Sequence, residues 1–140
     1  MTSADTPADN AGEAVAPEES LLRFASPKQW DSDGRPVPAA LSKRSDEDGV
    51  SVYVRGLLAS RALEPDSIIT GRPGYGVFSI GVATAIREGC VVEHDPVEDA
   101  EPPEIGFAHA LIKPPDKPAW LDARSALLAS AEVLVAPEAN

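Results

Sequence analysis

His109 is the side chain of this 140-residue chain best suited to acid–base chemistry. It lies in the alternating run Ile105–Lys113, and a neutral imidazole can both donate and accept a hydrogen bond near pH 7. As a general base it needs a carboxylate that orients the ring, and Glu93 or Asp95 supplies one if their segment lies beside that of His109. The structural alternative is a core histidine that hydrogen-bonds to the backbone or to an acid.

Nucleophilic catalysis has little support in the sequence. Ser51, Ser79 and Tyr53 are the candidate nucleophiles, but the chain has no G-x-S-x-G turn to present one of them. The single cysteine, Cys90, lies in an apolar run, so we expect it to be buried as a small hydrophobic side chain rather than to react. One cysteine also excludes an internal disulfide and a multi-cysteine zinc site.

No metal site or cofactor is expected. His94, Asp95 and His109 are of ligand type, but adjacent strand residues point to opposite faces, so the three cannot converge locally. The acidic turns that end at Gly34 and Gly49 lack the ligand spacing of a calcium-binding EF-hand loop.

Four residues are candidates for binding rather than catalysis. Arg72 and Tyr75 lie in the loop sequence GRPGYG, where the arginine could meet a phosphate or a partner's carboxylate; a plain surface loop is the alternative. Trp30 and Trp120 are the largest apolar side chains, and we expect them to anchor the edge of the core. If exposed, either becomes a candidate hot spot for a partner.

The stretch Gly76–Pro96 has the densest apolar run and should organise the fold. Large residues alternate with small ones from Val77 to Ile86, which predicts a strand. A polar break at Arg87–Gly89 then predicts a hairpin, whose second strand ends at Pro96. A helix through Val77–Arg87 is the alternative.

Other segments carry weaker patterns. Strands are predicted over residues 21–25, 39–44, 50–55 and 105–113, with a short turn at Ser26–Pro27 and an irregular connection over 97–104. Helices are predicted over 56–63 and from Asp116, the second with one stripe formed by Trp120, Leu121, Arg124, Leu127, Leu128 and Ala131. Val133–Val135 forms a strand or a last helical turn.

These elements predict an α+β fold, a small mostly antiparallel or mixed sheet with two or three short helices that cover one face. Residues 21–137 should form one domain with a single core. Residues 1–20 should form a disordered acidic tail, because Met1–Glu19 contains five acids and no Lys, Arg or aromatic residue.

The formal net charge is -11, from 23 acidic and 12 basic residues. An acidic surface repels phosphate backbones, so we expect no nucleic acid partner and favour a protein partner with a basic surface. No run is long enough to span a membrane, and the first 20 residues lack the basic start and apolar stretch of a signal peptide. We therefore expect a cytoplasmic protein; a homo-oligomer stays open.

The order of short motifs resembles a loosely defined group of small uncharacterised bacterial cytosolic proteins. The motifs are Gly-x-Pro at residue 34, DGVSVY, the glycine-aromatic loop before an apolar strand, and AHALI, within residues 22–115. The resemblance implies a bacterial cytosolic role alongside defence or toxin genes. A second likeness is to ADP-ribosyltransferase domains, which implies functional roles for Arg23, for Ser51 or Tyr53, and for Glu104.

Two functions follow from these observations. The first is a non-enzymatic protein-interaction module that works as a subunit, inhibitor or adaptor. The alternative is a small enzyme that uses His109 and nearby carboxylates, with an ADP-ribosyltransferase-like or other nucleotide-directed activity.

Overall fold

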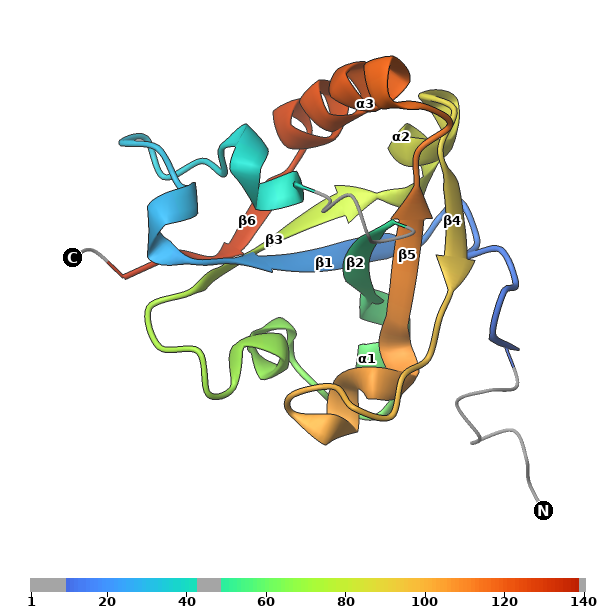
Figure 1. Cartoon of the computed structure of the whole chain (residues 1–140). Coiled ribbons are helices and arrows are strands. Elements are labelled where there is room, and N and C mark those ends of the chain that lie inside the picture. Colours follow the sequence, from blue (N-terminus) through green and yellow to red (C-terminus); the bar gives the residue numbers. More distant parts are fainter. Residues whose placement is uncertain (1–9, 43–48, 139–140) are drawn as a thin grey trace.

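A computed structural model describes residues 10–42 and 49–138 of the chain (Figure 1). These residues form one six-stranded sheet in the order β4-β5-β2-β1-β3-β6, in which every neighbouring pair is antiparallel. The predicted α+β class is confirmed. The strands are β1 (Ser20–Ala25), β2 (Val50–Val54), β3 (Gly76–Gly81), β4 (Val91–His94), β5 (His109–Lys113) and β6 (Glu132–Val135).

Helices connect the strands. Within the described ranges the α-helices are α1 (Arg55–Ser60), α2 (Val82–Arg87) and α3 (Lys117–Ala129). Short 3-10 helices cover Pro27–Gln29, Pro38–Leu41, Pro65–Ile69 and Pro103–Ala108. Each of these four begins with a proline, whose fixed φ suits the first turn of a helix.

The helices cover both faces of the sheet, not one as expected (Figure 1). The α3 face carries α2, α3 and the 3-10 helix 38–41, and the α1 face carries α1 and the 3-10 helices 65–69 and 103–108. Successive residues of a strand point to opposite faces, so Leu21 packs on the α3 face and Leu22 on the α1 face. Each face therefore has its own buried cluster, and the prediction of a single core is wrong.

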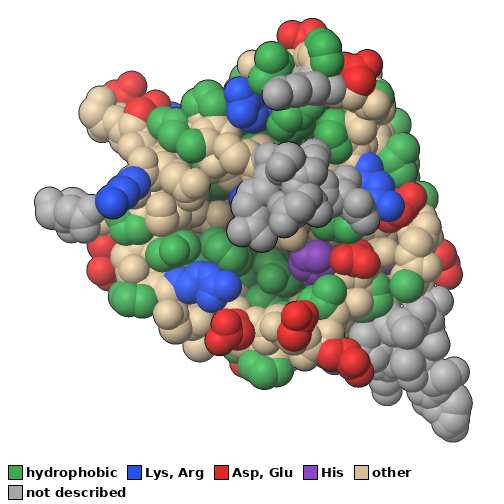
Figure 2. Space-filling model, viewed as in Figure 1, with side chains coloured by type: hydrophobic (Ala, Val, Ile, Leu, Met, Phe, Trp, Pro, Cys, Tyr) green, Lys and Arg blue, Asp and Glu red, His purple; other side chains and the backbone are tan. Residues whose placement is uncertain are grey.

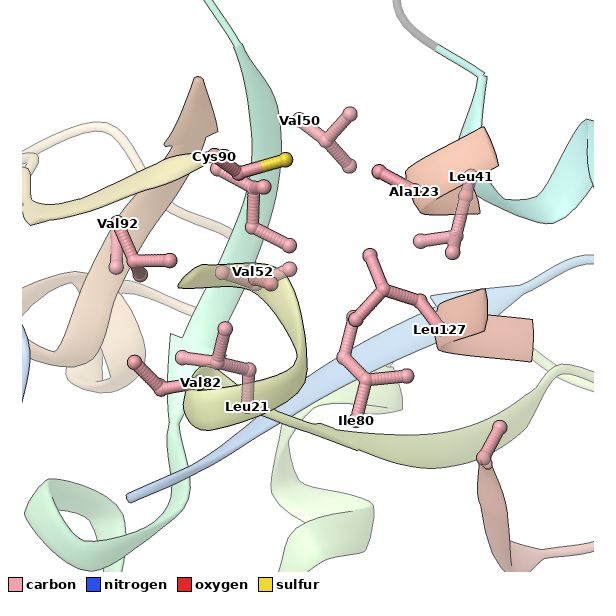
Figure 3. Packing of buried hydrophobic residues seen from close by; sticks show 14 of the residues in the cluster. Leu21, Leu41, Val50, Val52, Ile80, Val82, Cys90, Val92, Ala123 and Leu127 are labelled. Atoms are coloured by element: carbon pink, nitrogen blue, oxygen red, sulfur yellow. The ribbon is translucent and has the colours of Figure 1, made fainter. Parts of the chain in front are cut away.

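The cluster on the α3 face joins strand, helix and loop residues (Figure 3). Val52 and Ile80 come from the sheet, Val82 from α2 and Leu127 from α3, and each is at most 2% exposed. Full burial of one such side chain contributes about 1.5–3 kcal/mol. This cluster holds α2 and α3 on the sheet.

The cluster on the α1 face is smaller and includes polar side chains at its border. Leu22, Leu58, Ile68 and Ile105 are at most 1% exposed. In the sheet beneath them lie Tyr53 and His109, 8% and 7% exposed.

The stretch Gly76–Pro96 does not form the predicted hairpin. β3 ends at Gly81, the N–H of Val82 donates to the Glu19 carbonyl over 3.1 Å, and α2 begins there. Val82 and Ala85, three residues apart on one side of α2, are buried against the sheet. β5, β2 and β1 separate β3 from β4. The alternation of large and small residues fitted a longer strand, but tertiary burial favours a helix after Gly81.

The predicted strand over residues 39–44 is also wrong in its described part. The 3-10 helix Pro38–Leu41 buries Ala40 and Leu41 on the α3 face instead. Residues 43 and 44 lie outside the described residues. A proline at the first position favours a helical turn over a strand here.

Only the second half of the predicted strand 105–113 is a strand. Residues 103–108 form a 3-10 helix, and β5 begins at His109. Gly106 lies in this 3-10 helix, and a Cβ there would collide with the Val97 carbonyl oxygen. The N–H of Val97 donates to the Gly106 carbonyl over 3.0 Å, so the backbone turns tightly before β5.

Residues 10–19 differ from the expected disordered tail, because they pair with the edge strand β4. The N–H groups of Gly12 and Val15 donate to the His94 and Val92 carbonyls over 2.8 and 2.9 Å. His94 N–H donates to the Glu13 carbonyl over 2.8 Å, and Val15 is 2% exposed. An edge strand offers unpaired backbone groups, which this segment satisfies. The expectation for residues 1–9 falls outside the described residues.

The predicted C-terminal helix is confirmed. Asp116 caps α3, since its Oδ1 accepts the Ala119 N–H over 2.7 Å. Trp120 and Leu127 are buried as predicted, but Leu121 is 48% exposed and does not belong to the buried stripe. Ala123 takes that place. Of the two alternatives for Val133–Val135, a strand or a last helical turn, the structure shows the strand, β6.

Candidate functional site

Asp95 and His109 lie side by side because β4 pairs with β5. The N–H of Asp95 donates to the His109 carbonyl over 2.9 Å. His109 Nδ1 lies 2.8 Å from the Asp95 carbonyl oxygen and 3.1 Å from its Oδ2. A carbonyl oxygen only accepts hydrogen bonds, so Nδ1 carries the proton, and the neutral ring keeps its lone pair on Nε2. Asp95 is therefore the residue that orients the ring of His109, as the role of a general base requires.

Tyr53 lies opposite His109 in the β2–β5 register. The two rings meet edge to face, with centroids 5.5 Å apart and an interplanar angle of 72°. Burial raises the pKa of Tyr53 above its ordinary value, although the positive charges of Arg72 and Arg23 oppose the shift. The hydroxyl is therefore protonated at neutral pH and suits a hydrogen-bond donor better than a nucleophile.

Glu93 does not orient His109. It lies opposite Leu111 in the β4–β5 register, and its Oε1 is 2.8 Å from Lys113 Nζ. Both side chains of this ion pair are about one-third exposed. The Glu93–Lys113 ion pair is separate from the Asp95–His109 contact. The structure therefore supports Asp95, and not Glu93, as the carboxylate partner of His109.

Arg72 and Tyr75 lie on the α1 face and converge on Phe24. The Arg72 guanidinium carbon lies 4.4 Å from the centroid of the Phe24 ring, and the ring of Tyr75 lies 5.8 Å from it. Gly71 and Gly74 shape the loop with φ of 84° and 82°, a region that side chains rarely adopt. The sequence did not single out Phe24, whose alternation with Leu22 in β1 was the only signal available.

Trp30 and Trp120 belong to the α3 face and are separated from Arg72 and Tyr75 by the sheet. Trp30 Nε1 donates to the Ala25 carbonyl over 3.2 Å, and its ring packs edge-on against Phe78 with centroids 5.9 Å apart. Trp120 is 6% exposed. Both serve as core anchors here, and the four binding candidates do not form one site.

The residues that the ADP-ribosyltransferase likeness implied do not all lie on one face of the sheet. Arg23 points to the α3 side, where its Nε and Nη1 donate to the Ala40 and Ser51 carbonyls over 2.9 and 2.8 Å. Tyr53 lies on the α1 face, and Glu104 is exposed in the 3-10 helix 103–108. The Arg23 guanidinium joins the 3-10 helix 38–41 to β2 instead of entering a site with the other two.

Metal chemistry finds no support in residues 10–42 and 49–138, which hold no group of three or more His, Cys, Asp or Glu side chains placed to bind an ion. His94 and His109 come from opposite faces of the sheet, because His94 pairs with Ala110. Cys90 is 4% exposed, and burial together with the charge of Glu88 raises the pKa of its thiol. The expected buried, unreactive cysteine fits this environment.

Figure 2 shows how the polar groups are distributed on one side of the molecule. A histidine adjoins an acidic side chain at one border of a hollow lined by hydrophobic side chains, and a basic side chain lies at the opposite border. Among described residues, the α1 face thus brings together an Asp–His pair, a protonated phenol and a stacked guanidinium. Such a set can bind a polar group and exchange a proton with it.

Comparisons with protein-family models, curated proteins and solved structures give no match to this chain. Within the part of the chain that the structure describes, no helix combines the length and apolar character needed to cross a membrane.

Proposed function

We propose that the protein is a non-enzymatic interaction module of the bacterial cytoplasm, a subunit, inhibitor or adaptor that binds a protein partner. The observation that supports it most is a set of three exposed apolar side chains on adjoining elements, named here the apolar corner. Ile86, Val91 and Leu121 are the exposed large hydrophobic side chains of the described residues, at 45%, 50% and 48% exposure. They belong to α2, β4 and α3, and α2 contacts both of the other elements.

The apolar corner lies on an acidic molecule. Exposed apolar side chains that gather on adjoining elements are typical of partner surfaces. The net charge of -11 repels acidic proteins and attracts basic ones over several ångströms. The partner that fits is a protein with an apolar contact region inside a basic surface.

The experiment compares charge insertions at two places on the same helix. Leu121→Glu puts a carboxylate into the apolar corner, and Ala129→Glu puts one on an exposed position at the other end of α3. A partner identified by co-purification is then titrated against each purified variant by calorimetry. We expect Leu121→Glu to weaken binding about tenfold or more and Ala129→Glu to leave it nearly unchanged. Equal affinities of both variants would refute the assignment of the corner.

A small enzyme is the second candidate, favoured by the orientation of His109. Asp95 fixes the protonated Nδ1, and this leaves Nε2 as a base near the Tyr53 ring. His109→Gln separates the two candidates: an interaction module keeps its partner affinity, and an enzyme loses activity while it stays folded. A thermal-shift screen with nucleotides and NAD tests the nucleotide-directed reading, and no stabilisation by any of them argues against it.

A further inference from the structure

Three side chains on the α1 face offer complementary contacts to one small ligand. Tyr53 and His109 face each other across β2 and β5, and Leu22 of β1 lies on the other side of Tyr53. Phe24, two residues further along β1, has its side chain on the same face and carries the Arg72 guanidinium. Arg72 therefore lies on the same face of the sheet as Tyr53, and of the charges that act on the pKa of Tyr53, Arg72 has the largest effect.

The Arg72 guanidinium is held but not neutralised by the described residues. Its carbon lies 4.4 Å from the Phe24 ring centroid, and no Asp or Glu within residues 10–42 and 49–138 lies at ion-pair distance from it. Stacking engages the plane of a guanidinium and leaves its N–H groups, which lie in that plane, for an anion. In a chain of net charge -11, a cation that forms no ion pair with the described residues is well suited to bind an external anion.

Tyr53 and His109 define what else the ligand must carry. The hydroxyl of Tyr53 stays protonated at neutral pH, so it donates to an oxyanion. Nδ1 of His109 is engaged by Asp95, and Nε2 has no hydrogen-bond partner among the described residues. In the neutral ring Nε2 accepts a hydrogen bond, so it matches a hydroxyl or N–H group on the ligand.

The acidic neighbours limit the charge of the ligand. Asp95 contacts His109, and Asp99 lies near enough to Tyr53 to raise the pKa of its hydroxyl. A dianionic phosphate would be repelled by both carboxylates, whereas a monoanion bound at the arginine fork meets less repulsion. A carboxylate fits this balance of charges better than a phosphate.

We propose that Arg72, Tyr53 and His109 form a binding site for a carboxylate that carries an adjacent hydrogen-bond donor. Arg72 and Tyr53 bind the carboxylate oxygens, and Nε2 of His109 accepts from the neighbouring hydroxyl or N–H. The site is independent of the apolar corner formed by Ile86, Val91 and Leu121, which lies on other elements.

The test is an NMR titration of the full chain with L-lactate, acetate and inorganic phosphate at constant ionic strength. L-lactate has a hydroxyl beside its carboxylate and acetate has none. For ligands of this size we expect Kd on the order of millimolar for lactate, weaker binding of acetate and weakest binding of phosphate. The shift of the Arg72 Nε–H signal reports binding at this site.

Three variants decide the roles of the side chains. Arg72→Gln should weaken lactate binding about tenfold or more, since it removes the charged fork. Arg61→Gln is the matched control, because Arg61 also stacks on an aromatic ring, that of Phe107 at 3.6 Å. His109→Asn keeps a donor for the Asp95 carbonyl but removes Nε2, so lactate and acetate should then bind alike.

Several results would overturn the proposal. These are the absence of a saturable shift with lactate, an equal loss in Arg61→Gln and Arg72→Gln, and tighter binding of phosphate than of lactate. A preference for lactate that survives in His109→Asn would remove His109 from the site. Arg72 is only partly buried, so Arg72→Gln should fold, and the dispersion of its amide spectrum verifies this.

Discussion

His109 and Tyr53 show how single residues acquire polar roles inside a sheet. Asp95 provides both a carbonyl and a carboxylate oxygen to one ring nitrogen of His109, at 2.8 and 3.1 Å. Tyr53 lies across the ring and is buried enough to keep its proton. The roles of these residues follow from their partners, because burial keeps the proton on Tyr53 and the Asp95 carbonyl selects the tautomer of His109.

The raised pKa of Tyr53 predicts a loss of stability in alkaline solution. Below pH 10.0, the ordinary pKa, both the folded and unfolded chains keep the phenolic proton. As the pH rises above 10.0 the unfolded chain ionises first, so stability falls until the pH passes the higher folded pKa. We expect Tyr53→Phe to show a smaller alkaline loss in urea unfolding than wild type.

The pKa of Cys90 is also raised, from its ordinary value of 9.0, so ionisation of this thiol in the unfolded chain lowers stability in alkaline solution as well. The comparison is therefore made in a Cys90→Ala background. The difference in unfolding free energy between the tyrosine and phenylalanine chains at pH 7 serves as the reference. An alkaline loss of equal size in both chains would contradict the shift at Tyr53.

At the scale of elements, local signals decide where helices begin. The prediction for α3 was right because Asp116 and Pro118 are local signals at its start. The prediction for α2 was wrong because its residues suit strand and helix alike, and the start of the helix depends on contacts with Glu19 and the sheet.

Asp116→Ala should destabilise the protein by about 1 kcal/mol. The change removes the 2.7 Å hydrogen bond from Ala119 N–H to the capping carboxylate, and the first turn of α3 keeps an unpaired donor. Urea unfolding measures the effect. Asp122→Ala, at an exposed position inside α3, is the control and should change stability by less than about 0.5 kcal/mol. Equal effects would mean that the cap contributes nothing.

The segment 10–19 should contribute to stability through Val15. Val15→Asp places a carboxylate in the cluster on the α3 face at a position 2% exposed, and we expect a loss of about 3 kcal/mol or more. Ala16→Asp, one residue later and exposed, should cost little. Thermal unfolding of both variants measures this. A melting temperature of Val15→Asp equal to that of Ala16→Asp would show that the segment does not pack.

At the scale of the whole molecule, one sheet carries a buried cluster on each of its faces, and the chain is acidic. The clusters fix the strands between helices on both faces, and the formal net charge of -11 acts on partners. The apolar corner and the polar group on the α1 face lie on different elements. One molecule can therefore bind a protein and a small ligand at separate places.

Association with a basic partner should be strongly salt-dependent. Electrostatic attraction raises the association rate constant at low ionic strength, and at about 0.15 M salt the screening length is about 8 Å. Stopped-flow measurements should show a fall of about tenfold or more in the association rate constant from low to high salt, with a smaller change in the dissociation rate constant. A rate constant that does not depend on salt would point to a partner without a basic surface.

The candidate site was predictable only in part. His109 and Asp95 were named from residue type, and their contact depended on whether β4 lies beside β5. Arg72 and Tyr75 were named from their loop, but nothing in that loop indicates Phe24, which is about 50 residues away in the chain and holds both. Glu93 was an equal alternative to Asp95 until the structure placed it opposite Leu111 and in an ion pair with Lys113.

By itself the sequence determined the α+β class, the strands at Leu21–Ala25 and Val50–Val54, the start of α3 at Asp116 and the burial of Cys90. Alternation, capping and apolar runs depend on residues that are close together in the sequence. Structure that is determined by such local interactions can therefore be predicted from the sequence. Tertiary structure decided that helices cover both faces, that β4 pairs with β5 and that residues 10–19 complete an edge. These choices depend on which distant surfaces bury one another, and period-2 and period-3.6 patterns do not encode that pairing.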